Sequence, residues 1–152
     1  MHGEVTVHID APPAKVWELV SDVTRVGRYS PETFEAEWLD GATAPAVGVR
    51  FRGHVKRNGR GPTYWTTCTI LTCEPERDFA FGVGSSDKPV NTWRYTLTPS
   101  GAGTDVTESF TLRDIAPMHL YWRLFGKARG ATNERNMQAT LERMKAEVEN
   151  PD

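Results

Sequence analysis

Residues 92–113, TWRYTLTPSGAGTDVTESFTLR, contain two alternating runs on either side of a glycine-rich turn. Apolar side chains recur at every second position before and after the turn, which is typical of strands that bury one face. The tetrapeptide from Ser100 to Gly103 fits a two-residue hairpin loop, with Gly101 at the first central position that a type II′ turn reserves for glycine. The segment therefore predicts an antiparallel β-hairpin with one covered face and one solvated face.

One carboxylate, Glu108, breaks the apolar row of this hairpin. The turn sets a register in which the inner pairs are Trp93 with Phe110, Tyr95 with Glu108, and Leu97 with Val106. Glu108 is thus expected to point toward the covered face, beside Tyr95. Because a buried carboxylate without a partner is unfavourable, Glu108 must be hydrogen-bonded, protonated or next to a water-filled cavity.

Two interpretations of Glu108 stay open at this point. In the first, Tyr95, a tryptophan N–H or an arginine satisfies the carboxylate, and its role is structural. In the second, Glu108 is the polar anchor of an apolar ligand pocket. Desolvation would raise its pKa, whereas a carboxylate held by Tyr95 or an arginine would lose its stabilising contribution on acidification.

The rest of the chain up to residue 113 is a series of short strands and turns. An alternating run at Val5–Ile9 precedes a helical pattern at residues 10–23, with room for a short second helix after it. From Phe34 onward the segments alternate as strands, and Asn58-Gly59 is a strong hairpin signal. Successive hairpins predict an antiparallel sheet.

The C-terminal segment carries a single apolar stripe, spaced by four, three and four residues: Met137, Leu141, Met144 and Val148. This spacing predicts an amphipathic helix over Thr132–Glu149, capped near Thr132, that covers the sheet. Residues 118–127 form an earlier helical pattern. Gly126 and Gly130 are expected to kink or break the chain between the two.

The fold class that follows is α+β. We expect a curved antiparallel sheet of about six to seven strands wrapped around a long C-terminal helix, with one or two short helices after the first strand. A chain of 152 residues is long enough for one domain with a proper core and short for two. We therefore predict a single domain over residues 1–152.

Composition and motifs exclude several function classes. The formal net charge is -2 with acids and bases interleaved, so nucleic acid is not an expected partner. No apolar run approaches the roughly 20 residues of a membrane span, which argues against integral membrane association. The N-terminus reads as a strand and not as a signal peptide, and Cys68 and Cys73 do not make a disulfide framework, so the cytoplasm is the predicted location.

Metal and cofactor chemistry has no matching motif in the sequence. The four histidines, His2, His8, His54 and His119, are not at metal-ligand spacing, and His54 falls on the outer face of its strand. A nucleophile elbow, a phosphate loop and a dinucleotide fingerprint are also lacking. We therefore expect neither a metal nor a cofactor.

The order of elements, with the stretches IDAPPAKVWELVSDVTRVGRYSPE, GVRFRG, CEPERDFAF and TWRYTLTPSGAGTDVTESF and the amphipathic tail, resembles the START-related helix-grip superfamily of pollen-allergen-like proteins. Within it, the chain is most similar to the polyketide cyclase/dehydrase and lipid-transport family, over essentially its whole length. The resemblance implies a sheet that grips the last helix, with a ligand cavity between them. Members bind lipids, sterols, polyketides or other apolar molecules, and a minority are established enzymes.

The inward rows of such a sheet would line the cavity. The predicted ligand-binding residues are Phe51, Tyr64, Thr66, Phe81, Trp93, Tyr95, Glu108, Phe110, Tyr121, Met137 and Leu141. Trp65 is ambiguous, because a two-residue turn at Asn58-Gly59 puts Tyr64 inside whereas a bulge would turn Trp65 inward. The mouth is expected near Gly27–Pro31 and residues 118–127, where glycines interrupt the helices.

These observations favour a non-enzymatic intracellular binder or carrier of a small hydrophobic ligand, acting as a monomer or homodimer. The rival hypothesis is a polyketide cyclase or dehydratase, with Glu108 and Tyr95 as candidate catalytic residues acting on a bound poly-ketone. A regulatory or interaction protein with a vestigial cavity is the third.

Overall fold

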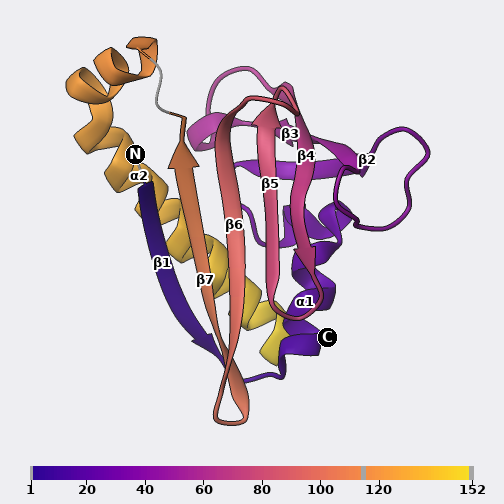
Figure 1. Ribbon diagram of the computed structural model, residues 1–152. Coiled ribbons are helices and arrows are strands. Elements are labelled where there is room, and N and C mark those ends of the chain that lie inside the picture. Colours follow the sequence, from indigo (N-terminus) through magenta and orange to yellow (C-terminus); the bar gives the residue numbers. More distant parts are fainter. Residues whose placement is uncertain (1, 114–115, 151–152) are drawn as a thin grey trace.

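Within residues 2–113 and 116–150, which the computed structural model describes, seven strands form one antiparallel sheet that curves around a long helix (Figure 1). The helix-grip architecture predicted from the sequence is confirmed. In chain order the elements are β1 (His2–Ile9), α1 (Pro13–Ser21), the 3₁₀ helix η1 (Val23–Arg28), β2 (Thr33–Trp38), β3 (Arg50–Val55), the 3₁₀ turn η2 (Arg57–Gly59), β4 (Tyr64–Glu74), β5 (Asp78–Gly84), β6 (Pro89–Ser100), β7 (Gly103–Leu112) and α2 (Ala116–Glu149).

The sheet has the order β1-β7-β6-β5-β4-β3-β2. The β6–β7 hairpin has the predicted register, with Ser100 opposite Gly103 and Tyr95 opposite Glu108. Gly101 has a φ of 60°, in the left-handed region that glycine adopts without strain. The hairpin therefore places Glu108 in the inner row of the sheet, as expected from the sequence.

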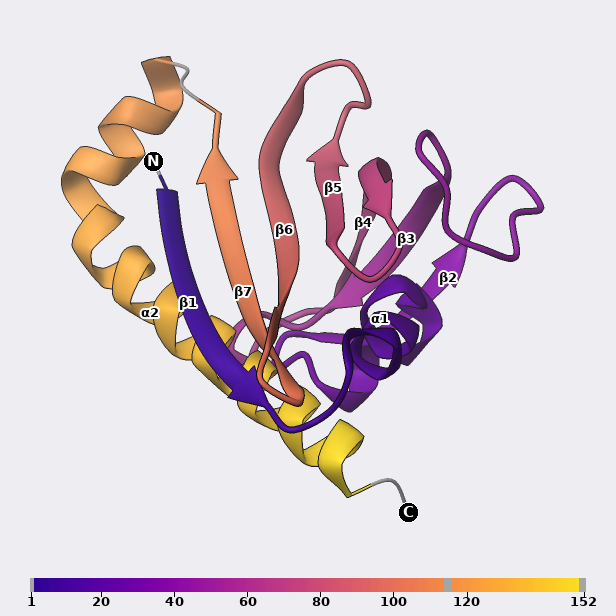
Figure 2. The ribbon, with the colours of Figure 1, turned by 60° about the horizontal axis from the view of Figure 1, so that its bottom comes forward.

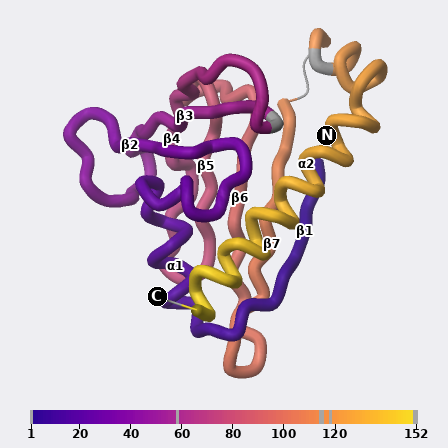
Figure 3. The backbone as a smooth tube through the Cα atoms, turned by 180° about the vertical axis from the view of Figure 1, so that it is seen from behind, coloured from indigo at the N-terminus to yellow at the C-terminus, as the bar shows by residue number. Residues whose placement is uncertain are grey.

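The helices pack on the concave face of the sheet. α2 crosses this face diagonally and packs mainly against β1, while α1 packs against β6 and β7 and η1 packs against β2 (Figures 2 and 3). η1 approaches β2 closely at Gly27, where a Cβ atom would lie 2.2 Å from the carbonyl oxygen of Phe34. Because no larger residue fits there, Gly27 sets how near η1 comes to the sheet.

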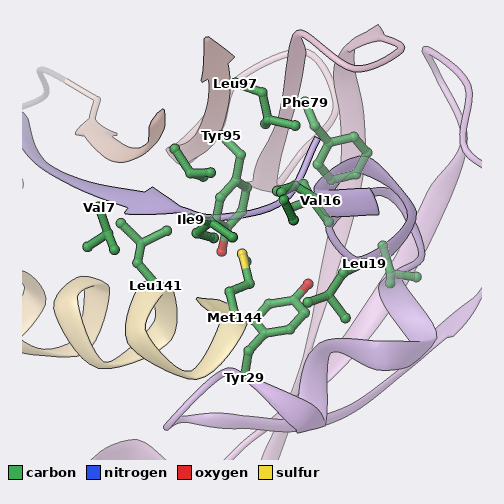
Figure 4. Close-up of a cluster of buried hydrophobic side chains, with 14 of the residues drawn as sticks. Val7, Ile9, Val16, Leu19, Tyr29, Phe79, Tyr95, Leu97, Leu141 and Met144 are labelled. Carbon is green, nitrogen blue, oxygen red and sulfur yellow. The ribbon is translucent and has the colours of Figure 1, made fainter. Parts of the chain in front are cut away.

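One end of the concave face is filled by apolar side chains. Ile9, Val16, Leu141 and Met144 are fully buried and belong to one cluster in which β1, α1 and α2 meet (Figure 4). Met137 is also buried, and Val148 packs against the cluster. The stripe predicted for the C-terminal helix therefore faces the sheet.

Of the kink or break predicted within the C-terminal helical region, the break is wrong, because α2 is continuous from Ala116 to Glu149. The axis of α2 does bend within its first third (Figure 2). A Cβ atom on Gly126 would lie 2.3 Å from the Trp122 ring, so this glycine makes room for the indole and does not end the helix. Thr132 is no cap, because its Oγ1 donates to the carbonyl of Ala128 from inside the helix. Neither α2 nor any other helix in the described part of the chain is long and apolar enough to cross a membrane.

The connection between β3 and β4 also differs from the prediction. Val55 lies opposite Tyr64, so a longer loop that contains η2 replaces the two-residue turn at Asn58-Gly59. The two-residue turn would have placed Pro62 opposite Val55. Because this error is an even number of residues, Tyr64 and Thr66 keep the face that the sequence assigned to them.

Candidate functional site

A cavity of about 400 Å³ lies between the concave face of the sheet, the end of η1 and the middle of α2. Most of its apolar lining comes from strands β3 to β6 and from η1. Much of its polar lining comes from α2, from the segment before β2, and from Glu108 on β7. The cavity is thus the unfilled continuation of the core shown in Figure 4.

Eight of the predicted ligand-binding residues line this cavity: Phe51, Tyr64, Thr66, Phe81, Trp93, Tyr95, Glu108 and Met137. They come from β3, β4, β5, β6, β7 and α2, so the fold gathers residues that lie far apart in the sequence. Their binding role is still a prediction, but their common location is a property of the structure.

The other three predicted residues lie outside the lining. The Phe110 ring is buried under the Trp122 indole, nearly parallel to it at 6.3 Å between ring centroids. Leu141 lies one turn beyond Met137 and is fully buried in the apolar cluster. Tyr121 is on an exposed part of α2, where its ring contacts that of Phe125. Among residues 118–127, no side chain that the structure describes borders the cavity, whereas residues 29–33 do border it.

Glu108 is the most buried carboxylate of the cavity lining, with 4% of its surface exposed. The Tyr95 hydroxyl donates a hydrogen bond of 3.0 Å to Oε1 of Glu108. Oε2 has no hydrogen-bond partner among the described residues. One oxygen of the carboxyl group is therefore held by the protein, whereas the other is a buried polar atom of the kind that proteins usually pair.

Burial raises the pKa of Glu108 from its ordinary value of 4.5 to about 8, and the Tyr95 hydrogen bond opposes this shift only in part. The pKa of Tyr95 is raised well above 10, first by burial and then by the nearby Glu108 carboxylate. At neutral pH both groups therefore carry a proton. Since Oε1 accepts from Tyr95, the acidic proton of Glu108 belongs on Oε2, where it can be donated.

A second tyrosine, Tyr29 at the end of η1, contributes to the same part of the cavity. It is 3% exposed, and both tyrosine side chains extend into the space beside Met144 (Figure 4). Its pKa is raised by burial and by the charges of Glu108 and Asp22. No periodic signal in the sequence pointed to Tyr29, because it follows the irregular turn at Gly27.

The sequence analysis also missed a polar row on α2: Arg129, Asn133, Asn136 and Thr140. Asn133 and Thr140 are buried, and all four residues border the cavity. They are spaced by four, three and four residues, the same spacing as the apolar stripe. That spacing was the available signal, since Asn133, Asn136 and Thr140 repeat as uncharged polar residues along one face of a largely charged helix.

Glu32, just before β2, joins this row to the opposite wall of the cavity. Arg129 forms an ion pair with Glu32 at 3.7 Å, and Asn136 donates a hydrogen bond to the same carboxylate oxygen. Both partners of the ion pair are largely shielded from solvent. Glu32 therefore ties the segment after η1 to α2 at the cavity border.

Trp65 lies on the outer face of the sheet. Its indole stacks on His54 at 4.2 Å between ring centroids, and the Arg52 guanidinium lies 4.2 Å from its centre. His54 is on the same outer face, as predicted, and its Nδ1 is 2.7 Å from a carboxylate oxygen of Glu35. The question that the sequence left open for Trp65 is answered in favour of the outer face.

Comparison with known proteins agrees with this geometry. A family model described as polyketide cyclase / dehydrase and lipid transport matches residues 1–149. A protein from Thermus thermophilus has a similar structure, with a TM-score of 0.75 and 18% identity over 100% of this chain and 99% of that one. A protein from Mesorhizobium loti is also similar, with a TM-score of 0.71 and 16% identity over 100% of this chain and 99% of that one. A Polyketide_cyc-like protein from Corynebacterium glutamicum is 27% identical, with a TM-score of 0.54 over 99% of this chain and 83% of that one. A search of curated proteins found no match.

Proposed function

Because this chain belongs to the polyketide cyclase/dehydrase and lipid transport family, we propose that it binds and carries a small hydrophobic molecule in its cavity. The ligand body lies against the aromatic rows of β3 to β6. Its polar end meets Glu108, Tyr95 and Tyr29. The volume of about 400 Å³ is in the range of small-molecule sites, roughly 300–1,000 Å³.

The observation that carries this proposal is the unpartnered Oε2 of Glu108 inside an apolar cavity. A buried polar atom without a partner costs on the order of 1–3 kcal/mol. A ligand oxygen at Oε2 would remove that penalty on binding. The hydrogen bond from Tyr95 is the contact that the structural interpretation of Glu108 named, but it engages only one of the two carboxyl oxygens.

The protonation state of Glu108 points to the chemistry of the ligand. With a pKa of about 8, the carboxyl group is neutral at pH 7 and donates from Oε2. The matching ligand group is a hydrogen-bond acceptor without charge, such as a ketone, ester or hydroxyl oxygen. A carboxylate at this depth would be desolvated without a cation beside it, which is unfavourable.

Native mass spectrometry of freshly purified protein tests binding, since a carried ligand adds a discrete mass. Titration with Nile red, a neutral apolar dye with a carbonyl acceptor, then tests the anchor. Glu108→Gln is expected to bind the dye like the wild type at neutral pH, because the amide also donates a hydrogen bond. Glu108→Leu is expected to lose about fivefold in affinity, the value of one neutral hydrogen bond.

The matched control is Glu4→Gln, which makes the same change on an exposed glutamate of β1 and should leave binding unchanged. Above pH 8 the wild type should lose affinity while Glu108→Gln should not. Equal affinity of Glu108→Leu and the wild type would exclude the anchor role. If no ligand mass co-purifies with the protein and the dye does not bind, the carrier function itself is overturned.

One observation favours a second candidate, a cyclase or dehydratase. Tyr29 adds a third protonated oxygen near Glu108 and Tyr95, so that a bound poly-ketone would meet several acids. A neutral carboxylic acid and tyrosine hydroxyls can polarise a carbonyl for enolisation or dehydration. Turnover of a poly-β-ketone that Glu108→Leu and Tyr95→Phe both abolish would establish the enzyme. Binding without turnover supports the carrier.

The proposal treats residues 1–152 as a single ligand-binding domain that works in the cytoplasm. The thiols support this location, because Cys68 and Cys73 are both free and burial raises the pKa of Cys68 to about 12. A thiol of that kind is a small buried hydrophobe with little reactivity.

A further inference from the structure

The first third of α2 exposes an apolar surface that the cavity does not use. We call Leu120, Tyr121, Leu124 and Phe125 the α2 patch. Leu120, Leu124 and Phe125 are 57–65% exposed and Tyr121 is 37% exposed. Large apolar side chains grouped on one helix face, with this exposure, mark a binding surface more often than scattered single residues do.

The α2 patch faces away from the sheet because of its place on the helix. At roughly 100° per residue, the α2 patch centres about 200° from the buried stripe of Met137, Leu141, Met144 and Val148. One continuous helix thus presents apolar residues on two nearly opposite sides. Trp122, on the inner side, packs against Phe110 and holds this part of α2 to β7, so the exposure is not a frayed end.

The charges around the α2 patch have one sign. From residue 115 to residue 133 the sequence contains Arg123, Lys127 and Arg129 and no aspartate or glutamate. Arg123 and Lys127 are exposed, next to the α2 patch. An exposed apolar helix face bordered by cations is the pattern of helices that lie in the interface of an anionic membrane.

Neighbouring loops extend this positive region. The β3–β4 and β5–β6 loops lie at the same end of the molecule as the start of α2 (Figures 1 and 3). Residues 56–63 and 84–90 contain Lys56, Arg57, Arg60 and Lys88 against one acid, Asp87. Arg57, Tyr64, Val90 and Asn91 from these loops and the adjoining strands also border the cavity, so the cavity reaches the end that carries the α2 patch.

We propose that the α2 patch docks the protein on the surface of an anionic lipid bilayer, with Leu120, Leu124 and Phe125 in the interface. Arg123 and Lys127 contact lipid phosphates. Docking brings the cavity border formed by the β3–β4 and β5–β6 loops close to the lipid. Transfer of a ligand between bilayer and cavity rests on the proposed function, whereas docking itself does not.

A bilayer fits this surface better than a second copy of the chain. A two-fold dimer through the α2 patch would bring Arg123 and Lys127 near their own copies without an acid on the helix segment to pair them. An anionic bilayer supplies the opposite charge and accepts an apolar surface of any shape. A protein partner would need its own acidic rim, which makes it an outcome of the test.

Sedimentation of the full chain with sucrose-loaded vesicles tests docking. We expect binding to phosphatidylcholine mixed with phosphatidylglycerol, little binding to phosphatidylcholine alone, and release at high salt. Leu124→Gln/Phe125→Gln should weaken binding at least about 50-fold, because two side chains no longer bury apolar surface. Lys127→Glu should weaken it roughly 5- to 30-fold by reversing one charge at the surface.

The matched controls are Val47→Gln, which changes a 66% exposed residue of the β2–β3 loop, and Arg143→Glu, which reverses an exposed charge on the far part of α2. Both should bind like the wild type, and circular dichroism should show all variants folded. Absence of binding to anionic vesicles, or full binding by Leu124→Gln/Phe125→Gln, would overturn the proposal. The proposal would also be overturned if sedimentation velocity showed a dimer of the wild type that only the Leu124→Gln/Phe125→Gln variant dissociates. The α2 patch would then be a self-association surface.

Discussion

The concave face of the sheet is packed at one end and hollow at the other. At the packed end, Ile9, Val16, Leu141 and Met144 have no exposed surface. At the hollow end, Phe81 and Trp93 are only partly buried, and the helix presents Asn133 and Thr140 toward them. Strands β4, β5 and β6 and helix α2 contribute side chains to both ends. The difference therefore lies partly in side-chain size and polarity along shared elements, and partly in how closely the helices approach the sheet.

The two ends have different roles: the packed end stabilises the fold, and the hollow end forms the cavity. Close packing of apolar groups at one end stabilises the fold, so the other end can leave space without unfolding the chain. Glu108 lies at the boundary, with one oxygen held by Tyr95 and the other without a partner among the described residues. The stability cost of a substitution should therefore depend on the end it changes.

Two phenylalanines of β5 give the largest expected contrast. Both rings border the cavity, but Phe79 is 1% exposed and meets the Trp17 indole edge-on, whereas Phe81, two residues later on the same face, is only partly buried. Phe79→Ala should lower the free energy of unfolding by about 3–5 kcal/mol, and Phe81→Ala by about 1–2 kcal/mol, because the Phe81 ring buries less of its surface. Urea denaturation measures both. Equal losses would mean that the hollow end is packed in solution.

Leu141 and Leu124 test the same contrast along α2. Leu141→Ala removes a fully buried side chain and should cost about 2–5 kcal/mol. Leu124→Ala changes a residue that is 65% exposed and should stay within about 0.5 kcal/mol. Thermal unfolding at one protein concentration compares them. A large loss for Leu124→Ala would show that the α2 patch is covered in the free protein.

Glu108 should make stability fall as the pH rises. Below pH 4.5 the carboxyl group is protonated in both states, whereas between 4.5 and about 8 the unfolded chain loses the proton and the folded protein keeps it. The slope has a ceiling of about 1.4 kcal/mol per pH unit, and solvation within the cavity reduces the total to about 2–3 kcal/mol. Denaturation at a series of pH values measures it.

Glu108→Gln is the matched variant for this titration, since its amide does not ionise. Its free energy of unfolding should be nearly flat between pH 5 and 8 apart from the changes that other groups give both proteins. Parallel curves for the two proteins would show that Glu108 has an ordinary pKa in the folded state. A wild type that gains stability as the pH rises would indicate a charged, hydrogen-bonded carboxylate instead.

The packed end could be predicted from the sequence to a large extent. The SGAG turn determined the β6–β7 register, and with it the pairing of Glu108 with Tyr95. The stripe through Leu141 identified the helix face that meets the sheet. Both features depend on local periodicity, which a sequence displays directly. The loop after β3 was mispredicted, but its even offset preserved the inward face of Tyr64.

The hollow end could be predicted only in part. Whether an aromatic residue such as Trp93 fills the core or lines a space depends on the distance between sheet and helix, which no local pattern encodes. Leu120 and Leu124 have the spacing of a buried stripe, yet they point outward because α2 continues through Gly126 without a break. The glycine signal was ambiguous, since glycine also accommodates a neighbouring ring such as that of Trp122.

The last comparison concerns the tie across the hollow end, where the expected effect on stability is small. Glu32→Gln removes the charge that pairs with Arg129 but keeps an oxygen that can accept from Asn136. The free energy of unfolding should fall by no more than about 1 kcal/mol, because the ion pair is long at 3.7 Å and the amide keeps the hydrogen bond from Asn136. Dissociation of Nile red should become severalfold faster, because the segment after η1 is held less firmly to α2 at the cavity border.

Glu37→Gln is the matched control, because Glu37 pairs with Arg52 on the outer face of the sheet, away from the cavity. It breaks an ion pair of the same chemical type at similar or lower cost, and it should leave dye dissociation unchanged in a stopped-flow measurement. If both variants release the dye at the wild-type rate, the tie is structural and ligand enters by another route. If only Glu32→Gln accelerates release, the contact between Glu32 and Arg129 controls access to the hollow end.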